Sequence, residues 1–287
     1  ILPNGSLARL NSAPIRGMRG CHLCTDEEDK YVFVSGYHDG KTTVLSLNPD
    51  GSVGKIVDGV FDRGYGSVAE RNFRPHVNCV NITPDQKYLC AVDLGVDQVK
   101  IYKFNDETGK ITLVDMLRCE LESAPRIIKF SPDGRFAYLI CELKNYISVY
   151  TYKDGPRGPV FELVQTISTL NEYHSKGSAA CVLRFSRDWN YVLCSNAGDN
   201  SVGIFKIDRV TGMLEKICIL PISGDYPKAA DFFPDNRHIM ALNHESNTMT
   251  IFRINYEKKY FSLWGKPLKV ETPNCVLVSE IEEAPKQ

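Results

Sequence analysis

Short apolar runs alternate with polar turns along this chain, and the pattern returns about every fifty residues. The residue that opens the second apolar run of each unit sets the register, namely Tyr31, Tyr88, Phe136, Tyr191 and His238. Their spacings are 57, 48, 55 and 47 residues, which is the period of propeller repeats. The chain therefore contains five complete copies of one unit. A sixth copy begins at Pro273 and stops after one apolar run.

The unit at 75–117 predicts four β-strands. Residues 75–82 alternate between apolar and polar positions, and the Thr-Pro-Asp-Gln sequence at 83–86 predicts a turn. Residues 88–92 form a nearly continuous apolar run, as expected for a strand that is buried on both faces. A polar loop at 93–97, an alternating run at 99–104, a turn at 105–109 and a last run at 111–117 complete the unit.

Four antiparallel strands that repeat at this period predict an all-β chain, a β-propeller of four-stranded blades with about six blades represented. A β-sandwich with accidental periodicity is the alternative, but five copies in register argue against it. We expect one domain over 1–287. We also expect the run at 275–278 to join strands near 1–10 and so complete one blade from both chain ends.

Composition narrows the function classes. The net charge is −1 with mixed signs along the chain, which argues against nucleic-acid binding and a polybasic membrane surface. No apolar run approaches the roughly 20 residues of a membrane-spanning helix. The ten cysteines lie mostly in strand-like runs and are read as reduced core thiols of a cytoplasmic protein. Cys21 and Cys24 match C-x-x-C, but a strand turns them to opposite faces, so no metal site and no cofactor is expected.

The strand order predicts where a site would form. In each blade the first strand is innermost, and its start lies on the same rim as the end of the antiparallel second strand. Polar residues at these places should converge around the mouth of the channel. They are His22, Tyr37, His38, Arg74, His76, Asn78, Asp93, Arg126, Glu142, Asn196, Lys228 and His244.

These residue types suggest acid–base chemistry on an anion. His76 and Glu142 are candidate proton-transfer groups, and Arg126, Arg74 and Lys228 could hold a phosphate or a carboxylate. Each has a structural alternative. Arg126 and Glu142 could simply pair with each other, Asp93 could bond its own loop backbone, and His22 and His244 could be ordinary rim residues.

Several of these motifs together resemble one family. Arg-Pro-His at 74–76, Asp-Leu-Gly at 93–95, Pro-Arg at 125–126 and Glu-Leu at 142–143 resemble the seven-bladed propeller lactonases, which include 6-phosphogluconolactonases and fungal carboxymuconate lactonising enzymes. The resemblance covers nearly the whole chain in blade order. It implies one further N-terminal repeat of roughly 50 residues, which would lie before the first residue, Ile1.

The resemblance implies His76, Arg126 and Glu142 as catalytic residues, with Arg74, Asn78, Lys228, His22 and His244 as substrate-binding candidates. The chain departs from the family pattern at two of these positions, where Asn78 replaces a histidine and Lys228 an arginine.

Three functions follow as hypotheses. The first is a metal-independent lactonase that opens an anionic sugar lactone of carbohydrate metabolism, such as the lactone of the pentose phosphate pathway. The second is a binding or scaffold propeller without catalysis, and the third is a cycloisomerase that acts on a carboxylated acid. The expected partner is thus a small-molecule anionic lactone, with no nucleic acid and no membrane, while the oligomeric state stays open.

Overall fold

Five antiparallel sheets, each built on four consecutive strands, make up the computed structural model of this chain, which describes residues 1–2, 4–66, 73–174 and 176–278. The first sheet contains β1 (Gly20–Thr25), β2 (Tyr31–Gly36), β3 (Lys41–Leu47) and β4 (Val53–Phe61). The second contains β5 (Val77–Ile82), β6 (Tyr88–Asp93), β7 (Gln98–Asn105) and β8 (Lys110–Arg118), with the short 3-10 helix η1 (Leu94–Val96) between β6 and β7. The third contains β9 (Pro125–Phe130), β10 (Phe136–Cys141), β11 (Tyr146–Gly155) and β12 (Gly158–Ser168).

The last two sheets repeat this order. The fourth contains β13 (Ala180–Phe185), β14 (Tyr191–Asn196), β15 (Ser201–Ile207) and β16 (Leu214–Pro221), and the fifth contains β17 (Pro227–Phe232), β18 (His238–Asn243), β19 (Thr248–Asn255) and β20 (Tyr260–Leu263). A two-residue strand, β21 (Leu268–Lys269), also pairs with β19. The five residues that set the register in the sequence each begin the second strand of a blade, so the propeller prediction is confirmed.

The same hydrogen bonds close the first turn in three successive blades. The hydroxyls of Thr83, Ser131 and Ser186 donate to the aspartate two residues later, at 2.6–2.7 Å. Each hydroxyl also accepts from the backbone N–H of the register residue, at 3.0 Å. The turn sequences therefore fix where each second strand begins.

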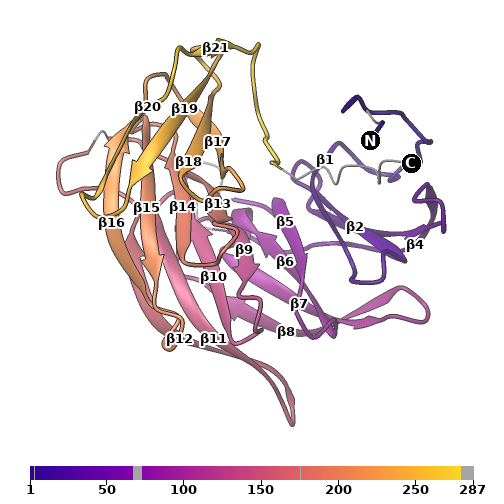
Figure 1. The fold of residues 1–287 in the computed structure, drawn as a ribbon. Coiled ribbons are helices and arrows are strands. Elements are labelled where there is room, and N and C mark those ends of the chain that lie inside the picture. Colours follow the sequence, from indigo (N-terminus) through magenta and orange to yellow (C-terminus); the bar gives the residue numbers. More distant parts are fainter. Residues whose placement is uncertain (3, 67–72, 175, 279–287) are drawn as a thin grey trace.

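The blades pack side by side around a channel lined by their first strands. Neighbouring first strands contact each other in the order β1, β5, β9, β13, β17, and an apolar core fills each of the four interfaces between successive blades. In Figure 1 the blades form an arc with β1 and β17 at its two ends. The face of β1 is accordingly exposed, with Leu23 at 63% exposure, whereas β5 is largely buried.

The sixth copy differs from the prediction. Residues 273–278 form no strand, and the described residues before β1 form none either, so the expected pairing of 275–278 with strands near 1–10 is not observed. The segment instead runs beside the first strands of the fourth and fifth blades. Arg184 donates to the carbonyl oxygen of Val276 at 3.3 Å, and the N–H of Val278 donates to Asp231 at 3.3 Å. Side chains therefore take the place of a backbone ladder here.

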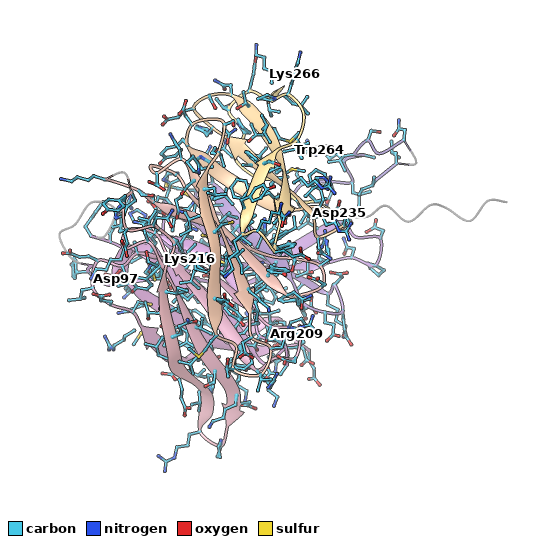
Figure 2. All side chains as sticks on the ribbon, turned by 60° about the vertical axis from the view of Figure 1, so that its left-hand side comes forward. Asp97, Arg209, Lys216, Asp235, Trp264 and Lys266 are labelled. Carbon is cyan, nitrogen blue, oxygen red and sulfur yellow. The ribbon has the colours of Figure 1, made fainter. Side chains whose placement is uncertain are left out.

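Side chains fill the space between the sheets (Figure 2). Of the residues described, no helix is long and apolar enough to cross a membrane.

Candidate functional site

A cavity of about 350 Å³ lies at the rim where the first strands begin. Its described lining residues come from the starts of first strands, the segments just before them, and the ends of second strands, as the antiparallel order predicts. They are Arg19, Cys21, Tyr37, His38, Asn78, Arg126, Glu142, Cys181, Tyr226 and Lys228.

A β-bulge in every first strand supplies one of these residues. In the second blade Val77 pairs with Asp93 and Cys79 pairs with Val92, so Asn78 has no partner residue on β6. The register shifts at the same place in the other four blades. The extra residues are Cys21, Asn78, Arg126, Cys181 and Lys228. Because a bulge re-aims a side chain, each blade presents one residue to the cavity.

Arg126 and Glu142 form an ion pair within this cavity. The side chain of Glu142 is 2% exposed and that of Arg126 is 25% exposed. Arg126 Nε also donates to the carbonyl oxygen of Cys181 at 2.8 Å, which ties the third blade to the fourth. Burial alone would lower the pKa of Arg126, but the negative charge of Glu142 outweighs it and raises this pKa above its ordinary value.

The charges of the lining favour an anion. Arg19, Arg126 and Lys228 are cations, and Glu142 is the carboxylate among the described lining residues. Lys228 lies near the Tyr226 ring and donates to the side chain of Asn274 at 3.3 Å. The excess of positive charge in a concave site raises the local concentration of anionic ligands.

His76 lies beneath the cavity and is absent from its described lining. Its ring stacks on Tyr37 at a centroid distance of 4.4 Å, and its Nδ1 lies 2.7 Å from the carbonyl oxygen of Tyr37. Burial lowers the pKa of His76, which favours a neutral ring that donates from Nδ1. His76 thus supports Tyr37, which does line the cavity.

The Asp-Leu-Gly sequence at 93–95 fixes the position of His76. Asp93 accepts hydrogen bonds from the backbone N–H of His76 at 2.8 Å and from that of Gly95 at 3.1 Å. An added Cβ on Gly95 would lie 1.7 Å from the carbonyl oxygen of Arg74 and 2.9 Å from the His76 ring. Asp93 therefore accepts from the backbone of its own loop, which is the structural role given above as its alternative.

Three other candidates lie outside the described lining of the cavity. Arg74 donates to the carbonyl oxygen of His38 at 2.9 Å and so braces the rim. His22 follows the bulge residue Cys21, and its Nε2 lies 3.7 Å from the sulfur of Cys79. His244 Nδ1 lies 3.1 Å from the carbonyl oxygen of Pro273. The structure places these side chains in contact with the backbone or core that surrounds the site.

Arg19, Cys21, Cys181 and Tyr226 line the cavity but were missed among the sequence candidates. A signal for the two cysteines was present. All five bulge residues stand ten positions before the register residue of their blade, so the repeat alignment that selects Asn78, Arg126 and Lys228 also selects Cys21 and Cys181. Arg19 and Tyr226 precede their strands and carry no such signal. In the described parts of the chain, no cluster of three or more His, Cys, Asp or Glu side chains could hold a metal ion.

Sequence comparisons find relatives that match most of this chain. The chain is 28% identical over 273 residues to a 6-phosphogluconolactonase of Bacillus subtilis, covering 95% of this chain and 77% of that protein. An uncharacterized Lactococcus lactis protein is 32% identical over 257 residues, with 90% and 74% covered.

Two solved structures superpose on most of this chain. A Bacteroides fragilis protein proposed to be a 6-phosphogluconolactonase superposes with a TM-score of 0.83 at 28% identity, covering 94% of this chain and 76% of that one. The periplasmic gluconolactonase of Pseudomonas aeruginosa gives 0.80 at 25% identity, with 88% and 71% covered. The family model described as "Lactonase, 7-bladed beta-propeller" matches residues 2–278. This chain therefore belongs to the seven-bladed propeller lactonases.

Proposed function

We propose that this protein hydrolyses an anionic sugar lactone, with 6-phosphogluconolactone as the substrate to test first. The observation that carries the proposal is that the nearly buried carboxylate of Glu142 and the guanidinium of Arg126 both line a cavity with an excess of cations. Relatives named 6-phosphogluconolactonase and gluconolactonase support the reaction class. A phosphorylated lactone would place the protein in carbohydrate metabolism, at the lactone of the pentose phosphate pathway.

The proposed reaction needs one base and one oxyanion donor. Glu142 accepts a proton from water as the water oxygen bonds to the lactone carbonyl carbon. Arg126 stabilises the negative charge that develops on the carbonyl oxygen. The bond from that carbon to the ring oxygen then breaks, and the ring oxygen takes up the proton to give the open hydroxy acid.

Other residues bind and position the substrate in this proposal. Lys228 and Arg19 hold the anionic group at the rim, while Asn78 and Tyr37 shape the wall of the cavity. His76, which the family resemblance implies as catalytic, acts through Tyr37 as a positioning residue, because it stacks on that ring and bonds its carbonyl oxygen.

The test is hydrolysis of 6-phosphogluconolactone with the spontaneous rate subtracted. We expect Glu142→Gln and Arg126→Ala to lower kcat/KM by at least about a hundredfold, because each removes a group that acts in the transition state. Glu162→Gln, at a carboxylate that is 65% exposed, is the matched control and should leave the rate unchanged. The same assay with unphosphorylated gluconolactone shows whether the phosphate is required.

Binding of an anion without turnover is the second candidate, and one observation favours it. Arg126 and Glu142 bind each other in the structure, and this is the pairing that would give both residues a structural role. Calorimetry with 6-phosphogluconate separates the two functions. Binding that is lost in Arg126→Ala, without enzyme-dependent hydrolysis in the wild type, would replace the lactonase proposal with the binding one.

We propose a reducing compartment, the cytoplasm, for this protein. All ten cysteines are free thiols in the structure, and free thiols persist where glutathione and thioredoxin keep them reduced. Fractionation of the source cells tests this proposal, and recovery of the protein outside the cytoplasm would contradict it.

A further inference from the structure

A second pocket lies at the opposite ends of the strands, between the third and fourth blades. Its volume is about 320 Å³. The lining comes from the first turns of both blades, the second strand of the third blade, and the end of the first strand and the second hairpin of the fourth blade. These residues are at the far ends of the same strands whose other ends form the cavity that Arg126 and Glu142 line, so the two sites are separate.

Four aromatic side chains form the walls of this pocket: Phe136, Tyr138, Phe185 and Trp189. Trp189 stacks on Phe185 at a centroid distance of 4.4 Å, and Phe185 meets Tyr138 edge to face at 5.2 Å. Tyr138 is held in place because its hydroxyl donates to the carbonyl oxygen of Gly212 at 2.9 Å. Walls of this kind offer both faces and edges to another aromatic ring.

The backbone at Trp189 is unusual for so large a residue. In every blade the residue two positions before the register residue has a positive φ, namely Asp29, Gln86, Gly134, Trp189 and Asn236. Glycine, asparagine and aspartate adopt this conformation at low cost, but a bulky residue does so with strain. Trp189 has a φ of 55°. The strained Trp189 lies at the interface between the third and fourth blades, where its ring forms a wall of the pocket.

The register residue of the third blade also differs from its tyrosine counterparts. Tyr31 sends its hydroxyl to the carbonyl oxygen of Glu107 at 3.2 Å, and Tyr88 sends its hydroxyl to Asp154 at 2.8 Å. Both bonds cross to the second hairpin of the next blade. Phe136 has no hydroxyl, and it faces the pocket together with Ile207 and Arg209 of the next blade.

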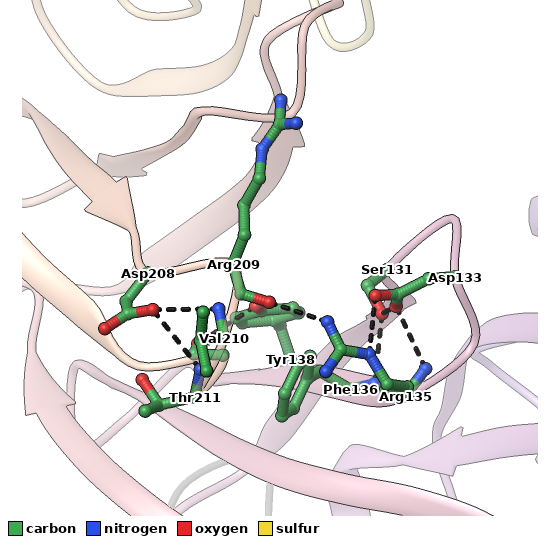
Figure 3. A network of polar contacts seen from close by, with 10 residues as sticks. Ser131, Asp133, Arg135, Phe136, Tyr138, Asp208, Arg209, Val210 and Thr211 are labelled. Carbon is green, nitrogen blue, oxygen red and sulfur yellow. Dashed lines mark hydrogen bonds and ion pairs between the residues drawn. The ribbon is translucent and has the colours of Figure 1, made fainter.

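Polar groups frame the mouth and are already matched to one another (Figure 3). Arg135 donates to the carbonyl oxygen of Arg209 at 2.7 Å and pairs with Asp133 at 2.7 Å. The guanidinium of Arg209 reaches the carbonyl oxygen of Asp188, pointing away from Arg135. The Asp188 carboxylate accepts from Ser186 and Asn190. The pocket therefore has an apolar, aromatic interior, and the charged groups at its mouth already have hydrogen-bond or ion-pair partners.

We propose that this pocket is a second binding site, for a small molecule that inserts an uncharged planar aromatic ring against Trp189. This site is independent of the proposed lactone hydrolysis. The strain at Trp189 is compensated by the stack on Phe185 and by the ligand ring.

The test uses 4-fluorobenzyl alcohol as the probe and Trp189 as the reporter. The chain has two tryptophans, so in Trp264→Phe the fluorescence comes from Trp189 alone. We expect the probe to quench or shift this fluorescence and to broaden its own ¹⁹F resonance in the wild type. Trp189→Asn, which suits the positive φ, should fold normally and bind the probe at least about tenfold more weakly, because the stacking wall is gone.

Three comparisons make the test decisive. Trp264→Phe should bind the probe as the wild type does, and lactone turnover, or anion binding if turnover is absent, should be the same in Trp189→Asn and wild type. Cyclohexylmethanol, similar in size and not aromatic, should fail to displace the probe. Equal broadening with wild type and Trp189→Asn, no broadening at millimolar probe, or full displacement by cyclohexylmethanol would each overturn the proposal.

Discussion

The side-chain amide of Asn78 donates a hydrogen bond to the backbone carbonyl oxygen of Arg126 at 3.1 Å. Both residues occupy the bulges that open their first strands, so the bond joins two neighbouring blades at the wall of the cavity that Arg126 and Glu142 line. Three residues further along β5, Asn81 makes the same kind of bond to the carbonyl oxygen of Ile128 at 3.1 Å. The two bonds are alike in chemistry and differ in their distance from the site.

This pair gives a prediction with a built-in control. Asn78→Ala should lower the free energy of unfolding by about 1 kcal/mol and kcat/KM for the lactone by about tenfold, because Arg126 loses its brace and small displacements of a catalytic group are costly. Asn81→Ala should cost similar stability and leave kcat/KM unchanged. Urea unfolding and lactone hydrolysis measure the two effects. Equal loss of activity in both variants would mean that Asn78 acts only through stability.

The bulges show how far the sequence alone leads to this site. The period of the repeat and the antiparallel strand order place the starts of first strands and the ends of second strands on one rim, and the cavity is there. Simple strand alternation cannot tell which side chain at each start faces the channel, because a bulge adds one residue and changes the facing of its neighbours. His22 illustrates this, since it follows the bulge residue Cys21 and turns toward Cys79.

The second prediction concerns Gly95. Gly95→Ala should destabilise the fold by about 1–3 kcal/mol, the usual cost of overpacking, because the new methyl group would collide with the carbonyl oxygen of Arg74 and press on the His76 ring. Since His76 supports Tyr37, lactone turnover should fall as well.

Gly265→Ala is the control for this change. An added Cβ at Gly265 meets nothing within 4 Å, but the φ of 79° is unfavourable for alanine. This variant should lose only about 1 kcal/mol and keep full activity. Thermal unfolding and the lactone assay compare the two variants. A Gly95→Ala protein that is as stable and active as the control would show that the loop can shift without moving His76.

The segment at 273–278 shows where the sequence pattern fails to predict the fold. Its Pro-Asn-Cys-Val sequence resembles the start of other first strands, and the sequence accordingly predicts a sixth innermost strand. Strand formation also requires a partner with a free ladder, which a local pattern cannot reveal. Here Arg184 and Asp231 bind the backbone of the segment instead, so the position resembles that of a strand while the ladder is absent.

A buried charge cluster below the site predicts a pH dependence. Asp62 pairs with Lys100 at 2.9 Å and accepts from the Tyr102 hydroxyl at 2.8 Å, and Lys100 lies 3.7 Å from Asp93. Burial raises the pKa of Asp93 to about 7. The unfolded chain releases this proton near pH 3.9, so the folded state holds more protons between these two values. Stability from this group therefore falls as pH rises from about 4 to about 7.

Asp93→Asn should remove this slope, because the amide stays neutral and its oxygen can still accept from His76 and Gly95. The difference in unfolding free energy between variant and wild type should move in favour of the variant as pH rises, by at most about 1.4 kcal/mol per unit. Urea titrations at pH 4.5, 6 and 7.5 measure it. Parallel curves would show that Asp93 is ionised throughout this range.

His22 predicts a pH effect of the opposite sign. Burial, with Lys129 and Arg184 nearby, lowers its pKa to about 4, against an ordinary value of about 6.5. Between these values the unfolded chain binds the proton and the folded chain does not, so stability falls as pH drops from about 6.5 to about 4. His22→Gln should remove this loss and so gain on the wild type in that window, by at most about 1.4 kcal/mol per pH unit. Urea titrations at pH 7, 5.5 and 4.5 compare this variant with the wild type. If His22→Gln follows the wild-type curve, the ring is protonated in the folded state and must have a partner in the channel.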